Sequence, residues 1–274
     1  MKRYRFGNKI LDFSKPIFMG IVNVTPDSFS DGGKYFDSRK AVQHGLLLDS
    51  QGADIIDIGG ESTRPGSGFI SVEEELSRTI PIIKILLKKK KGLLISIDTT
   101  KSEVAEEALK AGAVIVNDIS GGTFDDRMFK IAGAFDAGFI IMHMKGNPKT
   151  MQHTPSYKNL TKEIYSFFEK QVIAAKICKV KKIIIDPGIG FGKTVKHNFE
   201  IINHLSDFMR LGYPVLIGLS RKSFLGKTLN LGTNNRDIPT AIMEAVAFTK
   251  GASLIRTHNM EFGLLTKKLI TALR

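Results

Sequence analysis

Ile183-Ile-Ile-Asp186 is a short apolar run that ends on a carboxylate, and this form recurs along the whole chain. Seven further runs also end on a polar or charged residue, namely Ile21-Val-Asn23, Ile55-Ile-Asp57, Ile95-Ser-Ile-Asp98, Val114-Ile-Val-Asn117, Ile140-Ile-Met-His143, Leu216-Ile-Gly-Leu-Ser220 and Leu254-Ile-Arg256. Helical patterns follow them at residues 38–51, 72–89, 102–111, 125–135, 160–178, 195–211, 221–250 (broken at Asn234-Asn235 and Pro239) and 260–273. Strands that alternate with helices indicate a parallel sheet. Eight such units predict an α/β fold of the (β/α)₈ TIM-barrel type, with its active site at the C-terminal ends of the strands.

The length of the chain fits one such barrel. At 274 residues it is close to the usual size of this fold and leaves no room for a second large domain. We therefore expect a single domain over residues 1–274. Residues 2–13 precede the first barrel strand and predict a short hairpin-like lead-in, with Gly7-Asn8 at its turn.

Charge and composition narrow the class of protein. The chain carries 40 Lys and Arg against 27 Asp and Glu, a formal net charge of +13. The densest basic run, Lys88 to Lys91, falls at the end of a predicted helix, where the helix dipole favours cations. We therefore expect no nucleic-acid partner, although the positive field would steer a small polyanionic substrate.

The cysteine count and the hydropathy pattern indicate the compartment. The one cysteine, Cys178, excludes an intramolecular disulfide. No apolar stretch reaches the roughly 20 residues that span a bilayer, and no apolar segment of a signal peptide follows the first residues. The sequence therefore predicts a cytoplasmic enzyme without a membrane partner.

Four strand ends carry acidic or amide side chains: Asp57, Asp98, Asn117 and Asp186. For any one of them alone, capping of a neighbouring backbone group is a sufficient explanation. Four together would meet in one pocket of a barrel, where unpaired carboxylates are costly unless a ligand or cation supplies donors. Their chemistry suits a flat heterocycle with ring N–H and exocyclic amino groups.

A cationic set is expected on the same face of the barrel. It comprises Ser62-Thr63-Arg64, Lys222, Arg256 and His258. Loops after strands seven and eight commonly bind phosphate in this fold, and the Arg side chain offers a planar fork for phosphate oxygens. We therefore expect an anionic group, best a diphosphate, beside the heterocycle. Asn23 and Asp31, with Asp27 a weaker candidate, would hold a magnesium ion that bridges it.

The glycine-rich stretch Asp186-Pro-Gly-Ile-Gly-Phe-Gly-Lys-Thr194 is similar to a phosphate-binding loop but fails its spacing, because Pro187 stands where the first glycine is required. A Rossmann fingerprint fails as well, because the glycines come in the wrong order. The remaining interpretation is a tight turn that lets the backbone approach a ligand, with Phe191 and Lys193 at its edge.

These segments resemble the dihydropteroate synthase family of pterin-binding TIM barrels. The similarity rests on residues 19–33, 57–66, 96–101, 117–121, 142–146, 186–193 and 218–224. One difference stands at the end of the eighth strand, where the family usually has Arg-Val-His-Asp and this chain has Arg256-Thr-His-Asn259. The resemblance implies a magnesium-dependent transferase (EC 2.5.1.15) of folate biosynthesis that is a sulfonamide target and a homodimer formed through late helices.

Carried over position by position, the resemblance implies a set of binding residues. They are Asp98, Asn117, Asp186 and Lys222 for the pterin; Thr63, Arg64, Arg256 and His258 for the diphosphate; Phe29, Thr63, Pro65, Phe191, Ser220 and Lys222 for para-aminobenzoate; and Asn23 for magnesium. The catalytic residues are expected to be Asp98, Lys222, Arg256 and Asp31. The implied reaction joins a dihydropterin diphosphate to para-aminobenzoate by an SN1-like substitution.

Three alternatives to this function stay open at the sequence level. A pterin-dependent methyltransferase of the same superfamily would not need the diphosphate cluster. An aldolase would use Lys222 as a Schiff-base nucleophile. A non-catalytic pterin or anion carrier would bind without turnover.

Overall fold

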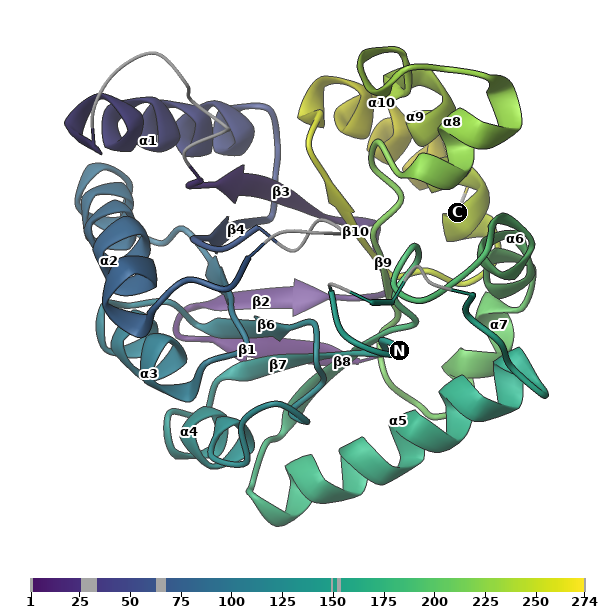
Figure 1. Cartoon of the computed structure of the whole chain (residues 1–274). Helices are drawn as coiled ribbons and strands as arrows, with labels where there is room; N and C mark the ends of the chain where they lie inside the picture. The colour runs from purple at the N-terminus through teal and green to yellow at the C-terminus, as the bar shows by residue number, and fades with distance from the viewer. Residues whose placement is uncertain (1, 26–33, 63–67, 149, 152–153, 274) are drawn as a thin grey trace.

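Eight parallel strands form the centre of the molecule, as the computed structural model shows for residues 2–25, 34–62, 68–148, 150–151 and 154–273 (Figure 1). In chain order they are β3 (Ile17–Asn23), β4 (Ile55–Gly59), β5 (Ile95–Asp98), β6 (Ile115–Asp118), β7 (Gly138–Met142), β8 (Lys182–Asp186), β9 (Leu216–Ile217) and β10 (Leu254–Thr257). Hydrogen bonds join them in the order β8, β7, β6, β5, β4, β3, β10, β9. A parallel bridge between Ile185 and Val215 joins the two ends, which confirms the predicted TIM barrel.

Helices follow the strands and surround them (Figure 1). They are α1 (Lys34–Ser50), α2 (Val72–Lys89), α3 (Ser102–Lys110), α4 (Met128–Ala134), α5 (Leu160–Ile177), α6 (Val195–Asn203), α7 (Leu205–Met209), α8 (Ser223–Leu229), α9 (Asp237–Thr249) and α10 (Met260–Ala272), with a 3₁₀ turn, η2 (Thr233–Asn235). The helix expected over 221–250 is in fact two helices and this turn, because Asn230 ends α8 in a left-handed conformation, φ 54°. The helix expected over 195–211 divides at His204.

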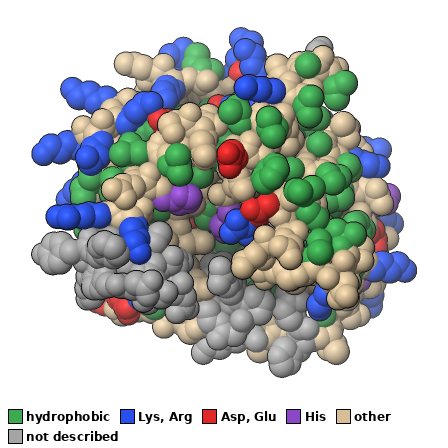
Figure 2. Space-filling model, turned by 90° about the horizontal axis from the view of Figure 1, so that it is seen from above, with side chains coloured by type: hydrophobic (Ala, Val, Ile, Leu, Met, Phe, Trp, Pro, Cys, Tyr) green, Lys and Arg blue, Asp and Glu red, His purple; other side chains and the backbone are tan. Residues whose placement is uncertain are grey.

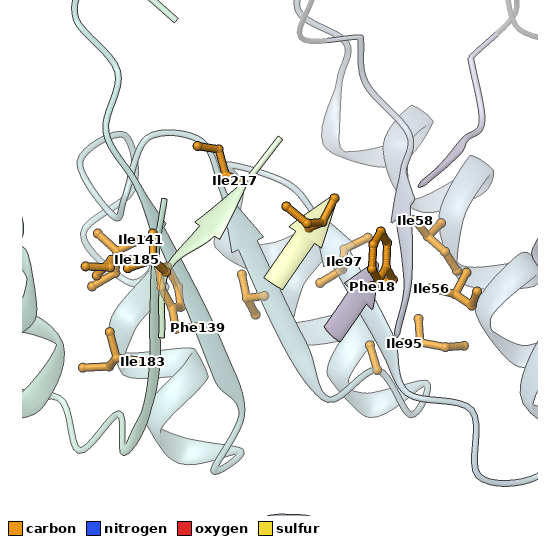
Figure 3. Close-up of a cluster of buried hydrophobic side chains, with 14 of the residues drawn as sticks. Phe18, Ile56, Ile58, Ile95, Ile97, Phe139, Ile141, Ile183, Ile185 and Ile217 are labelled. Carbon is orange, nitrogen blue, oxygen red and sulfur yellow. The ribbon is translucent and has the colours of Figure 1, made fainter. Parts of the chain in front are cut away.

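Alternation along the strands sorts the side chains into two layers. Residues such as Phe18, Ile56 and Ile97 belong to a large buried cluster that packs the strands against the helices (Figure 3). The residues between them, such as Met19, Ile55 and Leu94, belong to a second cluster inside the barrel. Both layers are apolar because each strand is covered on its two faces.

The N-terminal hairpin closes one end of the barrel. Its strands β1 (Arg3–Phe6) and β2 (Lys9–Asp12) pair antiparallel, as predicted, across the turn at Gly7-Asn8. Tyr4 and Phe6 join the inner apolar cluster, and the Tyr4 hydroxyl donates to the Ile183 carbonyl at 2.7 Å. The interior is therefore filled at the end where the strands begin, and a ligand can approach only from the other end.

Basic residues terminate α2, as the sequence predicted. Lys88 and Lys89 lie in its last turn and Lys90 is its C-cap. Within the part of the chain that the structure describes, none of the helices is both long enough and apolar enough to cross a membrane.

Candidate active site

Polar side chains gather where the strands end. The register pairs Asn23 with Gly59, Gly59 with Asp98, and Asp98 with Asn117, so these strand ends lie side by side. Met142 at the end of β7 pairs with Asp186 at the end of β8. The inward-facing positions are thus apolar near the hairpin and polar at the opposite end, which is the catalytic face of this fold.

Arg256 ties the acidic residues together. Its Nε lies 2.6 Å from Asp57 Oδ2, and its Nη2 lies 2.6 Å from Asp98 Oδ2. Asn117 Nδ2 donates to the same Asp57 oxygen at 3.1 Å. The cationic and acidic sets expected from the sequence are therefore not separate, because Arg256 lies among the carboxylates. Asp57, to which the sequence assigned no specific partner, is the residue that Arg256 and Asn117 share.

Burial shifts the ionisation of these groups. Desolvation raises the pKa of Asp98 to about 7, with Arg256 opposing the shift. It also raises the pKa of Asp186 to about 6, although the amide of Gly188 donates to Asp186 Oδ1 at 2.7 Å. Burial disfavours the Arg256 cation, but Asp57 and Asp98 outweigh burial and raise its pKa. The site thus holds the Arg256 cation beside Asp98, and the pKa values of Asp98 and Asp186 are both raised toward neutrality.

Among the described residues, a buried oxygen of Asp57 at this site has no hydrogen-bond donor. Asp57 is fully buried, and its Oδ1 accepts no hydrogen bond from any residue that the structure describes. A buried acceptor without a donor is costly, and in native proteins it commonly marks a place that a ligand or a water completes. A cavity opens beside Asp98, lined by Glu61, Ser62, Gly68, Phe69, Asp98, Thr99, Thr100, Ile119, Phe124 and Pro148.

A second group lies on the β8, β9 and β10 side of the barrel. Lys222 Nζ stands 4.2 Å from the centre of the Phe191 ring, a cation–π contact. Burial lowers the pKa of Lys222 to about 8, with Asp186 opposing the shift. Ser220 Oγ lies 3.0 Å from His258 Nδ1 and also accepts from the His258 amide at 3.1 Å. The structure therefore brings Phe191, Ser220, Lys222 and His258 together.

Five predicted site residues lie outside the described residues. They are Phe29, Asp31, Thr63, Arg64 and Pro65. The roles that the sequence gave them remain predictions. Asp27, the weaker magnesium candidate, also lies there.

Asn23 offers an oxygen at the place where magnesium is expected. A Cβ atom placed on Gly59 would lie 3.8 Å from Asn23 Oδ1 and 3.6 Å from Asp98 Oδ2. The two oxygens therefore face the same space beside Gly59. Amide and carboxylate oxygens are the ligands that Mg²⁺ takes, usually with waters and substrate phosphates. The donor chemistry fits the ion, although the described residues contain no group of three or more His, Cys, Asp or Glu that could hold a metal.

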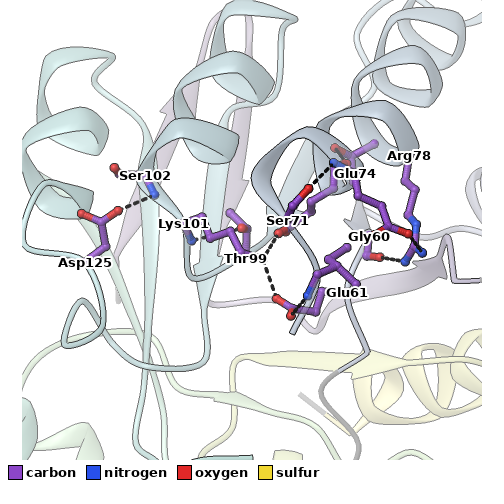
Figure 4. A network of polar contacts seen from close by, with 12 residues as sticks. Gly60, Glu61, Ser71, Glu74, Arg78, Thr99, Lys101, Ser102 and Asp125 are labelled. Carbon is purple, nitrogen blue, oxygen red and sulfur yellow. Dashed lines mark hydrogen bonds and ion pairs between the residues drawn. The ribbon is translucent and has the colours of Figure 1, made fainter. Parts of the chain in front are cut away.

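The loop after β4 is held at its base by a polar clamp, which we define as Glu61, Glu75 and Lys101. Figure 4 labels Glu61 and Lys101 of this clamp. Lys101 Nζ lies 2.8 Å from Glu61 Oε2 and 2.5 Å from Glu75 Oε2. Glu61 Oε1 also accepts from the Ile70 amide at 3.0 Å, which ties the two ends of this loop together. Nothing in the sequence marked this clamp, because Glu75 lies on α2 and Lys101 follows β5.

Lys101→Met is expected to lower the free energy of unfolding by about 3–5 kcal/mol, because it leaves the fully buried Glu75 without its cation. Lys110→Met is the matched control, since Lys110 pairs with Glu106 and Glu107 at the surface and its loss costs about 0–1 kcal/mol. Urea unfolding of both variants measures the difference. Equal losses in the two variants would show that the clamp contributes no more than a surface ion pair.

A polar site at the strand ends of a closed barrel agrees with one class of protein, the pterin binding enzymes. The family model of this class matches residues 19–258. A relative from Synechocystis, a dihydropteroate synthase, is 45% identical over 259 residues, which are 93% of this chain and 89% of that protein. The chain belongs to the dihydropteroate synthase family.

Solved structures agree with this assignment. A Yersinia pestis dihydropteroate synthase in a sulfonamide drug complex matches with a TM-score of 0.94 and 37% identity, covering 100% of this chain and 99% of that one. A Xanthomonas albilineans dihydropteroate synthase in complex with 7,8-dihydropteroate matches with a TM-score of 0.89 and 35% identity, covering 99% and 98%.

Proposed function

We propose that this protein acts as a dihydropteroate synthase of folate biosynthesis. It joins 6-hydroxymethyl-7,8-dihydropterin diphosphate to para-aminobenzoate and yields 7,8-dihydropteroate and diphosphate. The observation that carries this proposal is the cluster of Asp57, Asp98, Asn117 and Arg256 at the catalytic end of a barrel of this family. The related Xanthomonas albilineans enzyme was solved with the product of this reaction.

The pterin ring would lie among Asp98, Asn117, Asp186 and Lys222. Its ring N–H and amino groups donate to the carboxylates, while the Asn117 amide both donates and accepts. Asp98, Asn117 and Asp186 are buried, so the ring would take the place of water in a site of low dielectric. The open acceptor of Asp57 lies within the same cluster.

The reaction would begin with loss of the leaving group. The bond between the methylene carbon and the diphosphate oxygen breaks, and its electron pair leaves with the diphosphate. Asp98 stabilises the positive charge that develops on the pterin, and Arg256 and His258 stabilise the departing anion. Magnesium on Asn23 would neutralise further charge on the diphosphate.

The second step would form the new bond. The amine nitrogen of para-aminobenzoate attacks the methylene carbon and then loses a proton, which the diphosphate or water accepts. An arylamine is neutral at pH 7, so no strong general base is needed. Phe191, Ser220 and Lys222 would flank the aminobenzoate, with Phe29, Thr63 and Pro65 contributing from the two long loops. Arg64 would lie with Thr63 at the departing diphosphate. Asp31 would act beside them at the magnesium.

Product analysis tests this function against the aldolase alternative. The lowered pKa of Lys222 is a property that a Schiff-base lysine would also need. Incubation with both substrates and magnesium is expected to release dihydropteroate and diphosphate in equal amounts, with activity lost in EDTA and restored by magnesium. Borohydride is expected to leave the protein mass unchanged. A trapped covalent adduct on Lys222 without dihydropteroate formation would contradict the proposal.

We further propose that the chain, as one domain, forms a homodimer through α9 and α10 and works in the cytoplasm. Five large apolar side chains on or beside these helices are more than half exposed: Ile238, Ile242, Leu265, Leu269 and Leu273. Hydrophobic side chains gather on the side of the molecule where α8, α9 and α10 lie (Figure 2). A contiguous apolar patch of this kind commonly marks a protein interface.

Ile242→Asp combined with Leu269→Asp is expected to convert the dimer to monomers, because two charges would be buried unpaired in the interface. Sedimentation velocity at micromolar concentration measures the change. Leu47→Asp on α1, which is also about half exposed, is the control and should leave the dimer intact. A double variant that still sediments as a dimer would place the interface elsewhere.

A further inference from the structure

The glycine-rich turn after β8 packs directly on the backbone of the loop after β7. A Cβ built on Gly188 would lie 2.0 Å from the His143 carbonyl oxygen, and one built on Gly192 would lie 2.3 Å from that of Lys145. Both glycines have positive φ, 68° and 67°. Only glycine permits this approach, so the two loops form one unit.

Lys193 fastens this unit from within. It is 2% exposed, and its Nζ lies 3.0 Å from His143 Nδ1, 3.2 Å from the His143 carbonyl oxygen and 2.9 Å from the Phe191 carbonyl oxygen. Burial lowers the pKa of Lys193 to about 7, with Asp186 opposing the shift. In its ammonium form the group has three protons to donate, one for each of these acceptors. Burial lowers the pKa of His143 to about 2, so its imidazole is neutral and can accept at Nδ1.

The contacts of Lys193 differ from those of a substrate-binding lysine. All three acceptors belong to the protein, and two of them are backbone carbonyl oxygens. Its donors are therefore committed to the two loops and are not available to a phosphate. Phe191, in contrast, links this unit to the site. The Phe191 ring contacts Lys222, while the Phe191 carbonyl oxygen accepts from Lys193.

We propose that Lys193 is a positioning residue that acts through Phe191. By holding the Phe191 carbonyl against the loop after β7, it fixes the ring beside Lys222, where para-aminobenzoate would bind. The identity of the substrate in this inference rests on the proposed function. The contacts of Lys193 do not. It assigns a role to the one lysine of the glycine-rich turn, which the reaction itself does not use.

A double-mutant cycle tests whether Lys193 acts through Phe191. Lys193→Met keeps the length of the side chain and removes its donors, and is expected to raise the KM for para-aminobenzoate about tenfold with a smaller change in kcat. Introduced into Phe191→Ala, the same change is expected to alter this KM less than about twofold, because the ring that Lys193 positions is gone. Lys196→Met, an exposed lysine on α6, is the control and should leave KM unchanged.

Hydrogen exchange tests the geometry without any turnover. The Phe191 amide donates to the Gly188 carbonyl at 3.1 Å, inside the turn. Lys193→Met is expected to speed its exchange at least about tenfold, while amides of β4 and β5 keep their rates. If wild-type protein makes no dihydropteroate, this measurement still decides the positioning role, so failure of the function and failure of the inference are distinguishable.

Two results would overturn the inference. One is additivity, in which Lys193→Met raises KM equally with and without the Phe191 ring. The other is unchanged exchange at the Phe191 amide. Should Lys193→Met not fold, Lys193→Gln keeps N–H donors in the same place. It is expected to raise the KM less than Lys193→Met would, and again only when the Phe191 ring is present. Additive effects in that variant would likewise contradict the role.

Discussion

Asp98→Asn is expected to lower kcat by about 10²–10³-fold, while the Kd for the pterin diphosphate changes far less. The carboxylate acts on charge that appears only after the diphosphate begins to leave, so its loss affects the transition state more than the bound substrate. The Asn side chain keeps the shape and one acceptor oxygen. Pre-steady-state kinetics and a fluorescence titration with the pterin separate the two quantities.

The control for this substitution is Asp126→Asn, an exposed carboxyl near the same face, which should leave both quantities unchanged. Equal losses of kcat and of pterin affinity in Asp98→Asn would contradict the proposed role, because Asp98 would then serve only for binding.

The pH dependence of turnover is an independent test of the role of Asp98. The pKa of Asp98 is raised to about 7, so the carboxyl is charged above that pH and neutral below it. We therefore expect kcat to fall as the pH drops below about 7, and we expect this acidic limb to disappear in Asp98→Asn. An acidic limb that persists unchanged in the variant would assign it to another group.

Arg256→Met is expected to lower the free energy of unfolding by about 3–5 kcal/mol and to abolish turnover. The substitution leaves two buried carboxyl groups, Asp57 and Asp98, without the cation that contacts both at 2.6 Å. The loss of stability should grow as the pH rises through the raised pKa of Asp98, because the Asp98 carboxyl without its cation is tolerated while protonated and is costly once charged. Urea unfolding at pH 6 and pH 8 measures both effects.

Arg210→Met provides the matched control for stability. Arg210 is 78% exposed and pairs with Asp207 at 3.6 Å on the surface, so its loss should cost about 0–1 kcal/mol at either pH. A cost for Arg256→Met that is equally small, or that shrinks as the pH rises, would contradict the account of the buried ion pairs.

The sequence predicted the barrel and the location of its site because both follow from short-range pattern. Each strand is covered on both faces and reads as an apolar run, and the first polar residue marks its end at the catalytic face. That is how Asp98, Asn117, Asp186 and Arg256 could be singled out from the residues, with the resemblance adding their roles. The hairpin followed from the same reasoning applied to Gly7-Asn8.

The pairing of these residues could not be predicted in this way. Arg256 and Asp57 are 199 positions apart, and the choice between a phosphate and two carboxylates as partners of Arg256 depends on side-chain geometry. The contacts of Lys193 depend on how closely two glycines let separate loops approach. The division of residues 195–211 at His204 had no signal in the sequence, since no Pro or Gly interrupts the helical pattern there.

A crystal structure with 6-hydroxymethyl-7,8-dihydropterin diphosphate bound tests the site most directly. We expect the ring among Asp98, Asn117 and Asp186, and the diphosphate on the side of Arg256 and His258. A ring bound outside the barrel mouth, or a diphosphate remote from Arg256, would contradict the assignment of this cluster as the active site.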